Sequence, residues 1–228
     1  MKEIKGYCCD ATGCPIGTRP TIHIKIFSDY MCAWCYLADA FLASLKNRYD
    51  FELEHIGFEL HTSTPENGEP MALHHPSTPQ TLALINQLGA AYGLKICDLP
   101  ILANTKKALI VGEYAKTRGL SDAYVHAMWR AYMVDGKNIS LLSEIESAAN
   151  SIGITSEEVR NALDHPKYRE ALEKNRAIGQ SYGITSVPTF IINDEYKLSG
   201  TLRPEVFAEI FDEILANDAC TARKEAFS

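Results

Sequence analysis

The stretch Cys32-Ala33-Trp34-Cys35 decides the fold, because one kind of hydrophobic pattern gives way to another around it. Residues 21–27 alternate apolar with polar side chains and are rich in β-branched residues, which predicts a strand. Beyond the cysteines, apolar side chains recur at helical spacing, at Leu37, Ala38, Phe41, Leu42 and Leu45. The sequence therefore predicts a strand that leads directly into a helix, with Cys32 at the junction.

This junction suits a thiol that attacks disulfides. The unpaired N–H groups and the dipole of a helix N-terminus favour a thiolate, and they lower cysteine pKa values from about 8.5 to between ~3.5 and ~7.5. A second thiol one turn inside the helix is close enough to resolve the mixed disulfide. We therefore predict Cys32 as the nucleophile and Cys35 as the resolving thiol. Half of a zinc site is the alternative, but no second Cys-x2-Cys pair follows, and no metal is predicted.

The remaining patterns divide the chain into a sheet-containing part and a helical part. Three further strands are expected, at residues 51–60, 188–192 and 196–198. A turn-rich stretch with four prolines precedes residues 81–182, which read as helix with no strand signal, and an amphipathic helix follows the last strand. The predicted domains are a Cys-containing arm (1–19), a sheet domain (20–62 plus 183–217), an inserted helical domain (63–182) and a disordered tail (218–228).

Two helix starts can be located inside the helical block. Ser140 is predicted as the N-cap of the helix that carries Leu142 and Ile145. Residues 155–158 read Thr-Ser-Glu-Glu, which is the pattern of a capping box.

A second feature of the candidate site lies far away in the sequence. Residues 183–190 place Pro188 at the first position of an apolar strand, where proline is tolerated because it supplies no N–H to a sheet. A cis Val187–Pro188 bond would turn the preceding carbonyl and amide outward, toward an extended substrate. A trans proline at the start of a strand fits the same residues, and only about 5–6% of such bonds are cis.

Composition narrows the classes of partner and the compartment. Among 228 residues, 22 are Lys or Arg and 29 are Asp or Glu, so the net charge of −7 argues against nucleic acid or an anionic membrane as a partner. No stretch is apolar enough to span a bilayer, and residues 1–6 are not followed by the apolar core of a secretory signal. We therefore expect a cytoplasmic protein, in which closely spaced cysteines are redox-active or metal-binding rather than structural.

With the cysteine pair after the first strand and Ser186-Val187-Pro188-Thr189 before the third, the chain resembles the DsbA-like branch of the thioredoxin superfamily, and especially the FrnE-type disulfide oxidoreductases. Further segments that carry the resemblance are 29–36, 104–108, 130–132, 135–139, 199–200 and 204–207. The resemblance implies an α/β, thioredoxin-like fold with a large all-helical insertion, redox exchange at Cys32 and Cys35, and a cis-proline at Pro188. The resemblance is imperfect at Ala33-Trp34, since many relatives have proline as the first residue between the two cysteines.

The predicted activity is that of a protein disulfide oxidoreductase or isomerase acting on protein or small-molecule disulfides and dithiols. The backbone at Val187 and Pro188 would hold the substrate. Trp34 either shapes a hydrophobic docking surface or simply packs. No metal or organic cofactor is required, although glutathione could serve as the recycling thiol.

Two other functions share this architecture. Glutathione-dependent transferases of the kappa type and 2-hydroxychromene-2-carboxylate isomerases typically have serine where this chain has Cys32. A non-enzymatic redox sensor or chaperone-like module would use the dithiol only to switch the helical insertion.

The other cysteines leave several interpretations open. Cys8, Cys9 and Cys14 could supply an auxiliary dithiol that relays electrons to the Cys32–Cys35 pair. A metal clip with Cys220 or a histidine, or surface thiols without a role, are the alternatives. Some FrnE-type relatives carry an extra Cys-x4-Cys pair near the C-terminus, where this chain has only Cys220. Cys97, between apolar neighbours, is predicted as a small buried residue.

Overall fold

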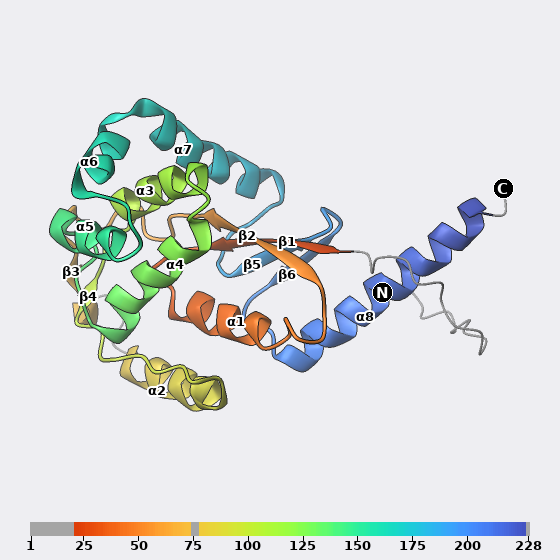
Figure 1. Cartoon of the computed structure of the whole chain (residues 1–228). Coiled ribbons are helices and arrows are strands. Elements are labelled where there is room, and N and C mark those ends of the chain that lie inside the picture. The colour runs from red at the N-terminus through yellow and green to blue at the C-terminus, as the bar shows by residue number, and fades with distance from the viewer. Residues whose placement is uncertain (1–20, 74–77, 227–228) are drawn as a thin grey trace.

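The computed structural model describes residues 21–73 and 78–226, and its centre is a mixed sheet with the strand order β2-β1-β5-β6 (Figure 1). The strands are β1 (Ile22–Ser28), β2 (Phe51–Gly57), β5 (Thr189–Ile192) and β6 (Tyr196–Ser199). β1 pairs in parallel with β2 and antiparallel with β5, and β5 pairs antiparallel with β6. The helix α1 (Ala33–Ala43) follows β1 closely, as the sequence predicts.

The alternation along β1 separates two apolar layers. Ile22, Ile24 and Ile26 are buried on one face, against α1 and α8 (Pro204–Ala226), which Figure 1 shows below the sheet. Phe27 packs on the other face with Ile56 and with Ile178 of α7 (Pro166–Ser181). A sheet covered on both faces is typical of α/β proteins with a crossover between parallel strands.

The apolar pattern of the second strand changes phase near His55, from Phe51 and Leu53 to Ile56 and Phe58, which fits either a bulge or burial on both faces. The register with β1 runs without interruption from Ile22 opposite Phe51 to Ser28 opposite Gly57. His55 and Ile56 are adjacent and both buried, because side chains on both faces of the sheet are covered at this point. The phase change therefore reflects burial on two faces and not a bulge.

The insertion between β2 and β5 consists mainly of helices, which bury a separate apolar core against α1. Its helices are η1 (Met71–Leu73), α2 (Thr78–Gly89), η2 (Ala90–Tyr92), α3 (Lys106–Thr117), α4 (Ser121–Trp129), the π-helix η3 (Arg130–Val134), α5 (Leu142–Asn150), α6 (Ser156–Asp164) and α7. Helix α1 lies between the two cores, with Ala38 and Leu42 toward the sheet and Leu37 and Phe41 toward the insertion.

The structure corrects three details of the sequence analysis. The insertion is not purely helical, since β3 (Glu69–Pro70) pairs with β4 (Ile101–Leu102), and strands of two residues are too short to show alternation. Helix α8 continues to Ala226, so residues 218–226 are helical rather than a disordered tail; residues 216–226 contain four alanines, which favour helix without an apolar stripe.

The third correction concerns Ser140, whose hydroxyl accepts the Asn104 N–H at 2.8 Å, while the N-cap of α5 is Leu141. The capping box is confirmed: the Thr155 hydroxyl accepts the Glu158 N–H at 3.2 Å, and the Glu158 carboxylate accepts the Thr155 N–H at 2.8 Å.

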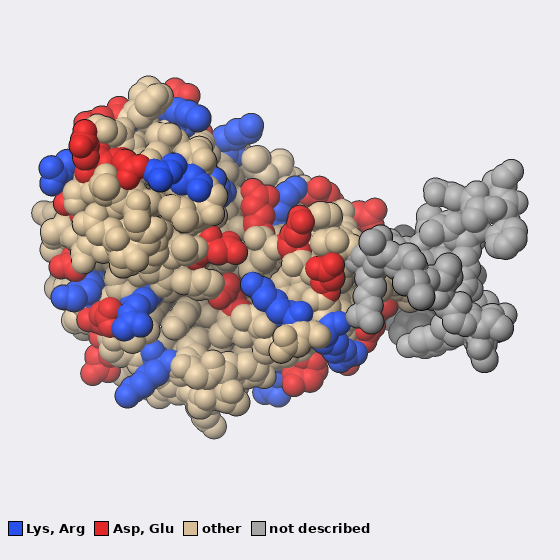
Figure 2. Space-filling model, in the orientation of Figure 1, with Lys and Arg blue, Asp and Glu red and all other residues tan. Residues whose placement is uncertain are grey.

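Charged side chains are interspersed on the face shown in Figure 2, where acidic and basic groups alternate over both the sheet domain and the insertion. The net charge of −7 is therefore not concentrated in one patch on that face. In the described part of the chain, none of the helices is long and apolar enough to cross a membrane.

Candidate active site

Cys32 is the N-cap of α1, at the junction that the sequence predicts. Its Sγ accepts the Cys35 N–H at 3.2 Å, and its own N–H donates to the Asp29 carbonyl at 3.1 Å. The side chain retains 7% of its exposure, and the thiol is free. An N–H donor at the positive end of a helix favours the thiolate form of a cysteine. Cys32 therefore lies at the start of a helix, with an N–H donor on its sulfur and a small part of its surface exposed.

Cys35 is one turn further into α1 and is fully buried, at 0% exposure. Burial raises the pKa of its thiol well above the usual value, and the hydrogen bond to Cys32 and the charge of that neighbour act in the same direction. A buried thiol that holds its proton does not compete with Cys32 for a substrate disulfide. The two cysteines thus differ in access in the way that the roles of nucleophile and resolving thiol require.

Pro188 lies on the opposite side of Cys32, and the Val187–Pro188 peptide bond is cis. The Cys32 thiol donates to the Val187 carbonyl across 3.7 Å, although the two residues are far apart in the sequence. The Pro188 carbonyl accepts the Gly200 N–H at 2.8 Å, and the Thr189 hydroxyl donates to the Ser186 carbonyl at 2.8 Å. These bonds hold the proline segment from both sides.

Trp34 is partly buried and packs against the core of the insertion. Its carbonyl accepts the Thr201 hydroxyl at 2.9 Å, so the loop after β6 contacts the dipeptide between the cysteines. Of the two roles considered for Trp34, packing is observed, and the docking surface stays a prediction.

Asp29 is a residue of this site whose role the sequence analysis missed. It is fully buried between β1 and Cys32, and its carboxylate accepts N–H groups from Leu60 at 2.7 Å and Met31 at 3.5 Å. Burial raises the pKa of the carboxyl group to about 6, although hydrogen bonds from Leu60 and from the Thr105 side chain oppose the shift. The sequence does contain a signal for this role, because Asp29 is an acidic residue between an apolar strand and the predicted nucleophile.

A second polar cluster, also missed, joins α1 to its neighbours. Asp39 lies between His126 of α4, at 2.9 Å from carboxyl oxygen to Nε2, and His55 of β2, at 3.6 Å. Burial lowers the pKa of His55, whereas the hydrogen bond to Asp39 raises that of His126. The buried His55 Nδ1 and Trp129 Nε1 make no hydrogen bond to the described residues. The histidines thus pair with a carboxyl group and not with a cysteine.

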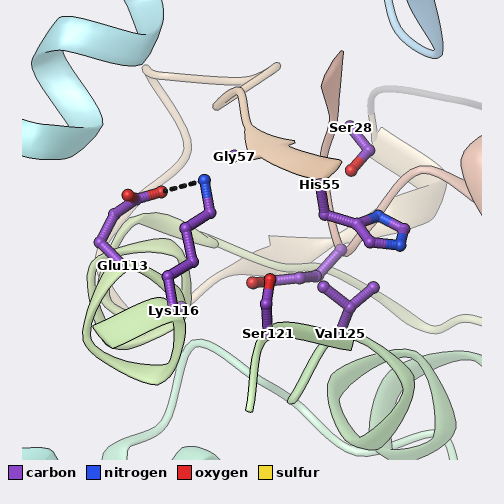
Figure 3. Close-up of a pocket in the computed structure, with 9 residues that line it drawn as sticks. Ser28, His55, Gly57, Glu113, Lys116, Ser121 and Val125 are labelled. Atoms are coloured by element: carbon purple, nitrogen blue, oxygen red, sulfur yellow. Dashed lines mark ion pairs between the residues drawn. The ribbon is translucent and has the colours of Figure 1, made fainter. Parts of the chain in front are cut away.

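A small polar pocket lies beside this cluster (Figure 3). Its lining includes His55 and Ser28 from the sheet and Glu113, Lys116 and Ser121 from the insertion, and the Lys116 ammonium lies 3.4 Å from the Glu113 carboxylate. The volume of about 10 Å³ is room for a single water molecule and not for an organic substrate. The described residues that line it do not include Cys32 or Cys35.

The remaining cysteines lie away from this arrangement or outside it. Cys97 is half-buried rather than fully buried, and its thiol donates to the Asp98 carbonyl at 3.2 Å. The predictions for Cys8, Cys9 and Cys14 lie outside the described residues, as does the side chain of Cys220. Among residues 21–72 and 78–217, whose side chains the structure describes, no three His, Cys, Asp or Glu side chains are grouped so that they could hold a metal ion.

A free dithiol at the start of the first helix, opposite a cis-proline on a four-stranded mixed sheet, defines a thioredoxin-fold dithiol protein. The DSBA-like thioredoxin domain matches residues 23–212, and the chain belongs to this family. The YwbO protein of Bacillus subtilis (strain 168) is 26% identical over 200 residues, which cover 85% of this chain and 97% of YwbO.

Solved structures share the fold across most of their length. A probable DsbA oxidoreductase from Streptomyces coelicolor has a TM-score of 0.77 at 24% identity, with 84% of this chain and 89% of that chain covered. A 2-hydroxychromene-2-carboxylate isomerase has a TM-score of 0.72 at 17% identity, covering 87% and 98%. The cytosolic disulfide reductase DsbM from Pseudomonas aeruginosa, solved with GSH, has a TM-score of 0.60 at 18% identity, covering 88% and 99%.

Proposed function

We propose that the protein is a thiol–disulfide oxidoreductase in which Cys32 attacks and Cys35 resolves. The observation that carries the proposal is the position of the Cys32 Sγ, which accepts the Cys35 N–H and lies 3.7 Å from the Val187 carbonyl. A nucleophile, a resolving thiol and a backbone edge for substrate therefore meet at one point. Family membership supports the same class of chemistry.

The reaction consists of two exchanges. The Cys32 thiolate attacks one sulfur of a substrate disulfide, which breaks that bond and releases the other sulfur as a thiolate that takes up a proton. The Cys35 thiol then loses its proton, and its sulfur attacks the Cys32 Sγ of the mixed disulfide. The Cys32–Cys35 disulfide forms, and the second substrate thiolate leaves and is protonated. Two electrons pass from the dithiol to the substrate, and the reverse sequence oxidises a substrate dithiol.

The substrates in this proposal are protein or small-molecule disulfides and dithiols. An extended substrate would pair with the backbone at Val187 and Pro188 in the manner of an added strand, next to the partly buried Trp34. Only thiols take part, so no metal or organic cofactor enters the reaction, and glutathione is the proposed recycling thiol in the cytoplasm. The proposed auxiliary dithiol is Cys14 with either Cys9 or Cys8.

Turnover of a disulfide substrate tests the proposal. Wild type, Cys32→Ser, Cys35→Ser and the control Cys97→Ser are each assayed for reduction of insulin and of glutathione disulfide with dithiothreitol as the electron source. We expect many turnovers by wild type and Cys97→Ser, none by Cys32→Ser, and an unresolved mixed disulfide with Cys35→Ser. A Cys32→Ser protein that keeps the wild-type rate would contradict the proposal, and a wild type that exchanges only once would favour the redox sensor.

The glutathione transferase or isomerase is the second candidate, because an isomerase of that kind shares the fold over most of both chains. Glutathione conjugation to 1-chloro-2,4-dinitrobenzene distinguishes the two. Conjugation that survives Cys32→Ser, together with no disulfide reduction by wild type, would favour the transferase. Peptide mapping during disulfide turnover tests the auxiliary dithiol, which fails if Cys8, Cys9 and Cys14 stay free thiols throughout.

A further inference from the structure

β2 forms one edge of the central sheet, because the strand order is β2-β1-β5-β6 (Figure 1). Its ladder with β1 starts with the Ile22 N–H, which donates to the Asp50 carbonyl at 3.2 Å. In a parallel pair, each strand bonds to its neighbour through alternate residues. The N–H and C=O groups of Glu52 and Glu54 therefore face β1, and those of Leu53 face away from it. Within the described part of the chain, no strand pairs with this outer edge.

A hollow of about 560 Å³ adjoins β1 and β2 near their first residues, at the opposite end of these strands from Cys32. Ligand sites in proteins commonly have volumes of about 300–1,000 Å³. Its lining comes from both strands, from the turn between α3 and α4 and from the turn between β5 and β6. The charged side chains of the lining are four carboxylates and two ammonium groups, on Glu52, Glu54, Asp122, Asp194, Lys25 and Lys116. The hollow therefore has an excess of negative charge at neutral pH.

The two lysines of the hollow already have acidic partners. The Lys25 ammonium lies 2.5 Å from the Asp194 carboxylate, across the start of the sheet. The Lys116 ammonium lies 3.4 Å from the Glu113 carboxylate and 4.0 Å from that of Glu54. The basic groups of the lining are therefore engaged with the protein's own carboxylates, and an anionic ligand would have to displace them.

Two exposed carboxylates of the lining have no lysine or arginine partner in the described residues. Glu52 lies 3.1 Å from the imidazole of His23 on the adjacent strand. Asp122, near the start of α4, has no hydrogen bond or ion pair to a described residue. Opposite charges favour association, and like charges oppose it. The hollow therefore favours a ligand that brings positive charge.

We propose that the outer edge of β2 and the hollow bind an extended polypeptide segment with basic side chains at alternate positions. The backbone of the segment would pair with Leu53, and its basic side chains would lie beside Glu52 and Glu54. A second copy of this chain fits less well. Two β2 strands paired around Leu53 would place Glu52 of one copy opposite Glu54 of the other, and like charges directly opposite each other are destabilising.

This segment would hold a protein substrate at a second place, a role that rests on the proposed disulfide exchange. β1 runs from the hollow, at His23, to Ser28, which is roughly 16 Å at about 3.3 Å per residue, and Cys32 follows shortly after the strand. One substrate chain can therefore contact the hollow and Cys32 together. A second contact raises the effective concentration of the substrate disulfide at Cys32.

Amide hydrogen exchange of the full-length protein, measured residue by residue by NMR, tests the docking step. The probe is a peptide without cysteine in which lysine alternates with threonine or valine. At about ten times the Kd of the peptide, exchange of the Leu53 amide should slow about tenfold, whereas the Glu52 and Glu54 amides, already bonded to β1, should change little. An unchanged Leu53 amide would overturn the inference. Strong protection of Leu53 without peptide would also overturn it, because another segment or a second copy would then cover the edge.

The double variant Glu52→Gln/Asp122→Asn tests the charge of the hollow. We expect the Kd of the fluorescently labelled peptide to rise about fivefold, and the wild-type Kd to rise in high salt. Glu157→Gln/Glu173→Gln is the matched control, because both carboxylates are exposed, lie outside the hollow and change the net charge equally. Its Kd should equal that of wild type. Equal weakening in both double variants would overturn the inference, because net charge alone would then explain the binding.

Kinetics with a peptide disulfide separate this inference from the proposed function. A substrate that carries the basic segment should have a KM about fivefold lower than the same substrate with glutamine in place of lysine. Glu52→Gln/Asp122→Asn should remove this difference and leave the reduction of glutathione disulfide unchanged. Disulfide exchange with equal KM values in wild type would refute the second contact and leave the proposed function intact. Binding of the cysteine-free peptide without exchange on any substrate would instead refute the proposed function.

Discussion

Two buried aspartates beside α1 show how differently one chain uses the same side chain. Asp29, before the helix, is held by backbone N–H groups and a hydroxyl, next to the cysteine turn. Asp39, inside the helix, lies between two imidazoles and joins α1 to β2 and α4. We call these regions the cysteine turn (residues 29–35 with Val187 and Pro188) and the histidine joint (Asp39, His55 and His126).

The two regions serve different purposes: the cysteine turn contains the reactive groups, whereas the histidine joint attaches one part of the fold to another. The partners of Asp29 keep their protons at neutral pH, so the charge of Asp29 itself is what varies near the cysteines. The partners of Asp39 are two imidazoles with opposite pKa shifts, lowered by burial for His55 and raised by the Asp39 hydrogen bond for His126, and they connect the sheet domain to the insertion. Changes in the cysteine turn should therefore alter rates, whereas changes in the histidine joint should alter stability.

The largest expected effect is on activity in the cysteine turn. Cys32→Ser should lower the rate of disulfide reduction at least about a hundredfold, because a hydroxyl is a far weaker nucleophile than a thiolate. The free energy of unfolding in urea should change by no more than about 0.5 kcal/mol, since the substitution is nearly isosteric. A large loss of stability in this variant would mean that the cysteine turn also holds the fold together.

The largest effect on stability is expected in the histidine joint. Asp39→Ala should lower the free energy of unfolding by about 3 kcal/mol, because it leaves a buried imidazole without its charged partner. Urea unfolding at pH 7 measures the loss, and Asp39→Asn, which keeps an acceptor, should lose less. The rate of disulfide reduction by folded Asp39→Ala should stay within twofold of wild type. A tenfold loss would show that the histidine joint also controls the exchange rate.

A smaller effect tests the loop that supports the cysteine turn. Thr201→Val removes the hydrogen bond to the Trp34 carbonyl while keeping the shape of the side chain. We expect a two- to threefold change in the exchange rate and a stability loss of about 1 kcal/mol, with Thr201→Ser restoring both. Reduction of glutathione disulfide and urea unfolding are the measurements. An unchanged rate in Thr201→Val would show that the hydrogen bond from this loop to Trp34 does not influence the exchange reaction.

The smallest effect concerns the pH dependence of the histidine joint. The pKa of His126 is raised in the folded protein, so its contribution is fully present below the ordinary pKa near 6.5 and is lost as the pH rises through the folded value. The contribution should be less than about 1 kcal/mol, because 54% of the side chain is exposed and solvent screens the pair.

His126→Gln should therefore differ most from wild type at pH 5.5 and least at pH 8.5, as measured by urea unfolding. His55 contributes with the opposite sign. Its pKa is lowered mainly by burial, and the His126 charge acts in the same direction as a smaller cause, so its contribution is lost as the pH falls below about 6.5. A difference between His126→Gln and wild type that grows toward pH 8.5 would refute the assignment.

Local patterns located most of the cysteine turn. Three patterns depend only on neighbours in the sequence: the alternation of residues 21–27, the helical spacing after Cys35 and the proline before an apolar strand. The structure has the corresponding strand, helix and proline segment at the predicted positions. The capping box at Thr155 succeeded for the same reason. Ser140 failed because its hydroxyl binds the distant Asn104 N–H rather than the start of its own helix.

The amino-acid sequence by itself determined the strand–helix junction, the positions of Cys32 and Cys35 in it and the proline segment opposite, since periodicity and side-chain chemistry act over a few residues. Only the tertiary structure decided which polar side chains share an environment. The pairing of Asp29 with Leu60 and Thr105, and of Asp39 with His55 and His126, joins residues from different elements. Burial and electrostatic interaction depend on distance in space, and folding alone brings these groups together.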